Sequence, residues 1–166
     1  MFVIAIAYPF DMRRHFFQAR FAIQKSRPGL GHGLFATANL SKGDFVLEYT
    51  GKKIPTKLAD EITSRYLFEI DRKWTVDGSV QSNLARYINH SCEPNCECVL
   101  EGGRILIYAS RDIEKGEELS FDYGEEYFDE YIKPMGCKCH KCRLQGTGHG
   151  LQSRGTVYSD QLSPET

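Results

Sequence analysis

The residues with the most varied chemistry form one run, residues 86–96, which reads Arg-Tyr-Ile-Asn-His-Ser-Cys-Glu-Pro-Asn-Cys. Within this run stand two amides, an imidazole, two hydroxyls and two thiols. These groups donate and accept hydrogen bonds and bind metals, and a core strand has no need of them. We therefore expect residues 86–96 to coordinate a ligand. Two other stretches, residues 29–33 and residues 118–123, carry groups suited to meet them there.

A second concentration of metal-binding groups consists of Cys137, Cys139 and Cys142. Thiols this close in sequence are poorly placed to pair with one another and well suited to converge on one metal ion. A tetrahedral zinc site needs a fourth ligand, and a site closed by four protein ligands is structural because no position is left for water. The candidates for that ligand are Cys92, Cys96, Cys98, His140 and His149. The alternative is a set of free surface thiols.

Glycines at positions 29, 31 and 33 surround Leu30 and His32. Glycine lets a backbone approach a ligand closely because it has no Cβ, but it is also the default residue of a tight turn. The spacing differs from the dinucleotide-binding fingerprint and no long helix follows. By itself the pattern favours a tight strand connection, and only its neighbours in the fold can make it a ligand loop.

Aromatic residues end or line several predicted strands, and four of them are candidates for a common channel: Tyr49, Tyr66, Phe121 and Tyr123. Lone tyrosines are usually core residues whose hydroxyl has a partner. A ring-lined channel would suit an alkyl-ammonium side chain. Beside them, residues 114–130 contain eight acidic residues and one lysine. Such a run is ordinarily a solvated face, but next to a site it would steer basic partners toward it.

The elements that must position these residues are short strands separated by frequent turns. Strands are predicted at residues 21–25, 34–37, 45–50, 66–70, 74–77 and 118–121, with a hairpin of residues 98–100 and 104–109 around Glu101-Gly102-Gly103. Short helical segments are predicted at residues 55–64, 83–88 and 125–133. Strands do not alternate with helices, which argues against a doubly wound sheet. The fold class is mainly β.

The chain resembles the SET-domain protein lysine methyltransferases that carry a post-SET zinc segment. Three stretches carry the resemblance in the family's order: Gly31-His32-Gly33 with Leu34-Phe35-Ala36, then residues 86–92, then residues 117–123. The resemblance implies a fold of small curved sheets with few short helices, in which the C-terminal segment passes beneath a preceding loop as a pseudo-knot. It also implies an N-terminal arm at residues 1–24, a SET domain at 25–124, a post-SET segment at 125–143 and a flexible tail at 144–166.

The resemblance further implies that the protein uses S-adenosylmethionine to methylate lysine side chains of a basic protein such as a histone. It assigns catalysis to Tyr123, with Tyr49 and Phe121 lining the lysine channel. Cofactor contacts are implied at Leu30, Gly31, His32, Gly33, Tyr66, Arg86, Asn89, His90 and Lys138. Structural zinc is implied at Cys92, Cys137, Cys139 and Cys142. The family usually has four residues between the second and third post-SET cysteines, whereas only His140 and Lys141 stand between them here.

Methyl transfer requires a neutral amine aligned with the methyl donor, so the enzyme contributes mainly positioning and desolvation. An ordinary tyrosine is protonated at neutral pH, and Tyr123 is therefore expected to orient the amine rather than act as the base. Phe121 stands where the family alternates phenylalanine and tyrosine. Phenylalanine leaves room in the channel, which predicts di- or trimethylation.

The main alternative is a catalytically silent SET-like module that uses zinc and a groove only to bind a partner. A secreted disulfide scaffold is disfavoured because the apolar run at residues 1–10 is followed, not preceded, by Arg13 and Arg14. That run is also too short to span a bilayer. With a net charge of −1, no global field attracts the chain to nucleic acid or membrane. We expect an intracellular protein, cytoplasmic or chromatin-associated, with reduced or metal-bound thiols.

Overall fold

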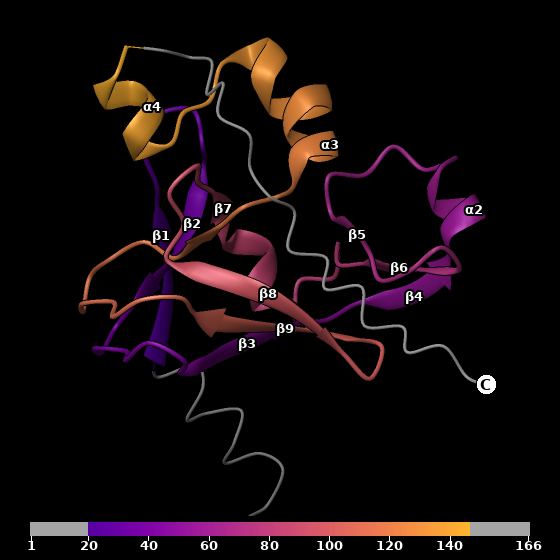
Figure 1. Ribbon diagram of the computed structural model, residues 1–166, viewed down its shortest axis with the longest axis horizontal. Helices are drawn as coiled ribbons and strands as arrows, with labels where there is room; N and C mark the ends of the chain where they lie inside the picture. The colour runs from indigo at the N-terminus through magenta and orange to yellow at the C-terminus, as the bar shows by residue number, and fades with distance from the viewer. Residues whose placement is uncertain (1–19, 147–166) are drawn as a thin grey trace, which may run out of the picture.

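A computed structural model describes residues 20–146 of the chain. The predicted arm is described only from residue 20 and the predicted tail only to residue 146, so most of both lies outside the described residues. Four small sheets and a few short helical turns make up the described part. The β8–β9 hairpin crosses the middle of the molecule, and α3 and α4 lie together at one end (Figure 1). The predicted mainly β class with few short helices is confirmed.

The first sheet is an antiparallel pair, β1 (Phe21–Lys25) and β2 (His32–Ala36). The glycine loop connects the two strands. Gly29 and Gly31 have φ values of 86° and 74°, a conformation that glycine adopts readily and other residues adopt at a cost. β1 begins before residue 25 and pairs with β2 along its whole length, so the predicted boundary between arm and domain falls inside a strand.

The central sheet has the order β3-β9-β8, formed by Phe45–Tyr49, Arg104–Ala109 and Cys96–Glu101. β8 and β9 form the predicted hairpin, and Gly102 and Gly103 at its tip have φ values of 57° and 72°. Positive φ at both central residues is the geometry of a type I′ turn, whose twist matches that of the flanking strands. β9 is the middle strand, and its side chains Ile105 and Ile107 are at most 1% exposed.

The third sheet has the order β4-β6-β5, formed by Lys52–Pro55, Trp74–Asp77 and Leu67–Glu69. Its outer strand β5 carries Phe68 toward the main core. The helix α2 (Thr56–Ala59) is shorter than the segment predicted for residues 55–64, since Pro55 belongs to β4 and the helix ends at Ala59. β4 was not predicted from the sequence. Ile54 is its one buried side chain, and a single buried position gives no recognisable alternation.

The fourth sheet contains the only parallel pair among the described strands, β7 (Asn89–His90) and β10 (Ser120–Phe121). The turn η1 (Leu84–Tyr87) leads into β7. After β10 the chain forms short helical turns: α3 (Glu125–Tyr127), η2 (Phe128–Ile132), η3 (Lys133–Met135) and α4 (His140–Leu144). β7 and α4 were not predicted. The passage of the C-terminal segment beneath a preceding loop stays a prediction.

Two hydrophobic clusters hold these elements together. The larger one contains side chains from β2, β3, β9 and the segment before β10, with Leu34, Val46, Ile107 and Leu119 each 0% exposed. The smaller one contains only Phe128 and three cysteines, and Cys92 and Ile132 pack against it. The parallel pair of β7 and β10, called the crossing below, lies between the two clusters. Phe121 at one side belongs to the first cluster, and Cys92 just after β7 borders the second.

Candidate active site

β7 and β10 bring the polar run of residues 86–96 beside the segment that ends at Tyr123. Asn89 lies opposite Ser120, and His90 lies opposite Phe121. Just beyond β7, the Ser91 N–H donates a hydrogen bond of 3.1 Å to the Phe121 carbonyl oxygen. An isolated pair of strands this short has little stability, so side chains on both sides must hold the crossing in place.

The Tyr123 hydroxyl is fixed at the inner side of this crossing. It donates a hydrogen bond of 2.8 Å to the Ile88 carbonyl oxygen. Burial raises the pKa of Tyr123 well above its ordinary value of 10, with a smaller contribution from neighbouring tyrosines. The hydroxyl therefore keeps its proton at neutral pH and directs it at a carbonyl. Its oxygen lone pairs remain able to accept from a donor in front of the ring.

A row of aromatic rings extends from β3 past β10 to the C-terminal turns. Neighbouring ring centroids are 5.5 Å apart for Tyr49 and Phe68, 6.3 Å for Phe68 and Phe121, and 4.9 Å for Phe121 and Tyr123. Tyr127 continues the row at 5.1 Å from Tyr123. The structure thus brings together Tyr49, Phe121 and Tyr123, which the sequence predicted for one channel. Phe68 and Tyr127 join them without having been predicted.

Tyr49 is held by backbone groups on both sides. Its hydroxyl donates to the Tyr66 carbonyl oxygen at 3.0 Å, and burial raises its pKa above the ordinary value. A Cβ on Gly78 would lie 2.2 Å from Cε1 of the Tyr49 ring, closer than atoms can approach. Gly78 is therefore required for the ring to occupy this position, a requirement that its sequence neighbourhood did not reveal.

Tyr66 and Arg86, both predicted to contact the cofactor, stack on each other. The guanidinium carbon of Arg86 lies 4.1 Å from the Tyr66 ring centroid and 5.6 Å from that of Tyr87. Arg86 also donates to the Ser79 carbonyl oxygen. Cation–π contact of this kind orients both groups. The pair thus forms a rigid polar surface that continues directly into β7.

The glycine loop meets the crossing through side-chain to backbone hydrogen bonds. The Asn89 amide nitrogen donates to the His32 carbonyl oxygen at 3.1 Å. From the C-terminal segment, Lys138 Nζ reaches the Gly29 carbonyl oxygen at 3.4 Å. Residues 29–33 are thus held from both sides, and Leu30 lies in the turn between them. The structure brings the predicted cofactor residues of the loop, the crossing and the C-terminal segment together.

His90 connects the tyrosine side of the crossing to the cysteine side. Its Nδ1 accepts the backbone N–H of Tyr123 at 3.2 Å, and its Nε2 lies 3.5 Å from the Cys92 sulfur. Because a backbone N–H can only donate, Nδ1 must be the acceptor and the ring proton of the neutral imidazole belongs on Nε2. That proton points at Cys92, an arrangement common for groups that orient metal ligands.

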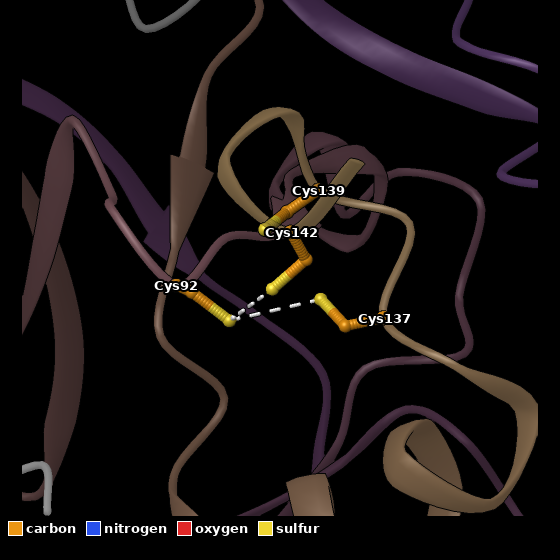
Figure 2. A group of neighbouring side chains, drawn as sticks. All are labelled: Cys92, Cys137, Cys139 and Cys142. Carbon is orange, nitrogen blue, oxygen red and sulfur yellow. Dashed lines mark hydrogen bonds between the residues drawn. The ribbon is translucent and has the colours of Figure 1, made fainter. Parts of the chain in front are cut away.

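Four cysteine side chains converge from two segments of the chain (Figure 2). The sulfur atoms of Cys92, Cys137, Cys139 and Cys142 all lie within 4.8 Å of one another. Cys92 Sγ is 3.7 Å from Cys137 Sγ and 3.5 Å from Cys142 Sγ. A tetrahedral zinc ion with Zn–S bonds of 2.3 Å separates its sulfurs by about 3.8 Å. The donor set and spacing therefore fit structural zinc, despite the short spacer between Cys139 and Cys142.

The thiols of this cluster also influence one another. Hydrogen bonding with the Cys137 thiol lowers the pKa of Cys139, and the same contact raises the pKa of Cys137. All six cysteines of the chain fall within the described residues and none forms a disulfide. Cys96 and Cys98 lie outside the cluster, and burial raises the pKa of each thiol to about 12. Neither thiol belongs to the four-cysteine cluster, so neither is a candidate ligand of its metal.

The family model that matches this chain is the SET domain, over residues 31–124. The chain belongs to the SET-domain family. The matched segment begins in the glycine loop and ends just after Tyr123, so it contains the β7–β10 pair and the aromatic row from Tyr49 to Tyr123. The cysteines at positions 137–142 follow it, which is consistent with a post-SET zinc segment behind the SET domain.

Relatives of this SET-domain chain are named histone-lysine N-methyltransferases. The set1 protein of Dictyostelium discoideum is 45% identical over 67% of this chain. A histone H3 lysine-4 specific enzyme of Schizosaccharomyces pombe is 44% identical over 64%, and trithorax of Drosophila virilis is 41% identical over 68%. The matched segments cover only 8%, 13% and 3% of those proteins, so the chain spans a small part of their length.

A polar cavity of about 520 Å³ lies beside the SET-domain crossing, and its walls include Arg27, Asn95, Arg111, Glu118 and Lys141. None of the predicted cofactor residues lines it. Glu118 borders this cavity and also bonds to Asn89, so it separates the cavity from the predicted cofactor residues. The sequence placed Glu118 in the motif at residues 117–123 and in an acidic run, but gave its side chain no role of its own. No described helix of the chain is long and apolar enough to cross a membrane.

Proposed function

We propose that this chain transfers methyl groups from S-adenosylmethionine to lysine side chains of a basic protein. The observation that carries the proposal is the position of the Tyr123 hydroxyl. It lies at one end of the crossing, beside the aromatic row, with its proton committed to the Ile88 carbonyl oxygen. An incoming amine can therefore donate to the tyrosine oxygen while rings enclose its alkyl chain.

The cofactor supplies an electrophilic methyl group on a sulfonium centre. The residues that would hold it are those of the glycine loop, the Tyr66–Arg86 stack, the two strand residues Asn89 and His90, and Lys138. Their chemistry fits the ligand: Lys138 is a cation for its carboxylate, and Asn89 offers an amide to its amino group. The backbone of His90 is proposed to contact the adenine. These assignments give the predicted cofactor residues their proposed roles in the site.

The substrate lysine must reach the site as a neutral amine, although its ordinary pKa is about 10.4. The rings of Tyr49, Phe68, Phe121 and Tyr123 desolvate the incoming side chain, and desolvation favours the uncharged amine. Tyr123 is not proposed as the base, because its raised pKa keeps the hydroxyl protonated. Its contribution is to align the amine through its oxygen, a positioning effect.

The number of methyl groups transferred is proposed to depend on Phe121. The Phe121 ring is 5% exposed and packs between Phe68 and Tyr123. It carries no hydroxyl that would hold a water molecule or the amine in the channel. A methylated amine therefore has room to turn and accept a further methyl group, which supports di- or trimethylation.

A basic protein such as a histone tail is the proposed substrate, because the relatives are named histone-lysine N-methyltransferases and residues 114–130 are strongly acidic. Direct binding of nucleic acid is not proposed, since the net charge is −1. A chromatin location follows from a histone substrate. Structural zinc at the four-cysteine cluster is proposed to hold the C-terminal segment against the crossing.

Isothermal titration calorimetry with S-adenosylmethionine tests the proposal, combined with mass spectrometry of histone peptides after incubation. We expect cofactor binding and a mass gain of methyl groups on lysine. Tyr123→Phe removes the hydroxyl and keeps the ring, so it should retain cofactor binding and lose most of the transfer, by about 100-fold or more. Absence of cofactor binding by the zinc-loaded wild-type protein would leave only the alternative, a silent binding module.

A further inference from the structure

Glu118 occupies the junction between the glycine loop and the crossing. Its backbone lies between β2 and β10, where residue 118 forms an isolated antiparallel bridge with Phe35. Its carboxylate is only 10% exposed and accepts from three side chains. Ser26 Oγ and Asn89 Nδ2 donate to Oε1 at 2.6 and 2.7 Å, and Arg27 Nη2 donates to Oε2 at 3.3 Å. The Glu118 carboxylate thus accepts hydrogen bonds at both of its oxygens and lies beside the predicted cofactor site. No role has been assigned to it so far.

The contact between Glu118 and Asn89 depends on Gly33. A Cβ built on Gly33 would lie 2.3 Å from Oε1 of Glu118 and 3.2 Å from Nδ2 of Asn89. Any side chain at position 33 would therefore displace the carboxylate. The glycine that the sequence suggested for a close approach to a ligand also permits a close approach by this glutamate.

The surroundings of Asn89 determine which way its amide faces. Its two neighbours on one side are Oε1 of Glu118 at 2.7 Å and the His32 carbonyl oxygen at 3.1 Å. Both oxygens only accept in these contacts, so the NH₂ group must face them and both of its N–H bonds are used. Rotating the amide would place its oxygen against two other oxygens. The amide oxygen Oδ1 must therefore face the other way, as an acceptor.

We propose that Glu118 is a positioning residue that locks the Asn89 amide with Oδ1 toward the cofactor, so that the site selects a cofactor carrying a protonated α-amino group. The inference rests on the proposed function and deepens it. An ammonium group only donates, and a locked acceptor is complementary to it. A freely rotating amide would present either its oxygen or its NH₂ group, and it would discriminate poorly.

Glu118→Gln tests the lock with little change in shape. Arg27 requires an acceptor, so the oxygen of the new amide faces Arg27 and its NH₂ group faces Asn89. Asn89 then meets a donor where it met an acceptor, and its amide is no longer held in one orientation. Arg27→Gln is the matched control, because it removes the charged neighbour and leaves the carboxylate contact with Asn89 intact.

The measurement is the ratio of two dissociation constants from calorimetry, one for S-adenosylmethionine and one for an analogue in which hydrogen replaces the α-amino group. We expect the wild-type protein and Arg27→Gln to prefer the natural cofactor by about tenfold or more. In Glu118→Gln the preference should fall to about twofold or less, with the KM for the cofactor raised more than kcat is lowered. A merely structural role would weaken both ligands equally and leave the ratio unchanged.

An unchanged ratio in folded Glu118→Gln protein overturns the inference. If that variant melts well below the wild type, the same ratio is measured for Gly33→Ala, whose Cβ displaces the carboxylate, and retention of the preference there also overturns it. Failure of the wild-type protein to bind S-adenosylmethionine is a different result, since it contradicts the proposed function itself. Binding without loss of selectivity in the variants contradicts only the role of Glu118.

Discussion

The two hydrophobic clusters on either side of the crossing differ in what stabilises them. The main core contains large aliphatic side chains from several sheets, including Leu34, Ile105 and Ile107, each at most 1% exposed. The C-terminal cluster contains Phe128 and three cysteines. Burial of apolar surface can stabilise the first, whereas so small a segment needs a metal or another cross-link. The SET body thus has a conventional core, whereas the attachment of the C-terminal segment is proposed to depend on the metal.

This difference predicts that loss of zinc strongly lowers activity while it leaves the stability of the body nearly unchanged. In Cys139→Ser, or after chelation of the zinc-loaded protein, amide hydrogen exchange should become fast across residues 128–142 and stay slow in β3, β8 and β9. Methyl transfer should fall by about tenfold to 100-fold, because the segment that becomes mobile carries Lys138 and packs Phe128 against His90. Cys98→Ala removes a thiol outside the cluster and should retain bound zinc. An equal rise of the amide exchange rate in both regions would show that the two regions do not differ in what stabilises them.

A substitution in the main core should destabilise the SET body and leave the four-cysteine cluster intact. Ile107→Ala truncates a fully buried side chain in the middle strand of the central sheet, and such truncations cost about 2–5 kcal/mol. Urea unfolding should show this loss, while zinc content under native conditions stays unchanged. Ile23 is 43% exposed, so Ile23→Ala should cost less than about 0.5 kcal/mol. A comparable loss for both variants would contradict the assignment of the core.

A substitution in the aromatic row should change the number of methyl groups transferred without affecting the stability of either region. Phe121→Tyr adds a hydroxyl in the aromatic row, where it can hold a water molecule or the amine and crowd further methylation. Mass spectrometry of the product peptides should show a shift toward monomethyl-lysine. Phe45→Tyr makes the same substitution outside the channel and should keep the wild-type product distribution. An unchanged distribution in Phe121→Tyr would remove this residue from product control.

The smallest effect is expected from a surface ion pair of the body. Arg104 donates to both oxygens of Glu48, and this hydrogen bonding lowers the pKa of Glu48 below its ordinary value of 4.5. The contribution is therefore present above about pH 4.5 and is lost as the pH falls through the lower folded pKa. At pH 7, Glu48→Gln should lower the Tm by about 1–3 °C. Thermal melts should show this gap closing at pH 3, and a gap that widened there would contradict the sign.

Sequence reasoning recovered the parts of the fold that carry a long enough signal. The strands at residues 21–25 and 74–77 were predicted with the observed bounds, and the β8–β9 hairpin was predicted from its two glycines. β7 was missed because two residues show no alternation, although it carries Asn89 and His90. The pairing of β7 with β10 joins segments far apart in sequence, and no local pattern encodes it.

The candidate site shows the same division. Residues in compact motifs, such as Cys92 and Tyr123, could be named from the sequence, and the structure places both beside the β7–β10 pair; their roles remain proposals. Tyr127 was missed, yet Tyr127 and Tyr131 are spaced like side chains on one helix face, and their ring centroids are 4.8 Å apart. Glu118 was named within the motif at residues 117–123, but its role was not predicted because nothing in an acidic run shows which carboxylate the fold shields from solvent. Only the fold distinguishes Glu118 from the other seven acidic residues of the run, because its carboxylate is 10% exposed and accepts from three different side chains.

The hydrogen bond between Ser26 and Glu118 joins residues that are 92 positions apart. The ribosome therefore synthesises Ser26 well before Glu118. Ribosomes add about 5–20 residues per second, so about 5–18 seconds separate the appearance of the two partners. Through that interval the glycine loop exists without the carboxylate that holds Asn89. Cofactor affinity should therefore arise late and abruptly during synthesis, and an interrupted chain would be inert rather than partly active.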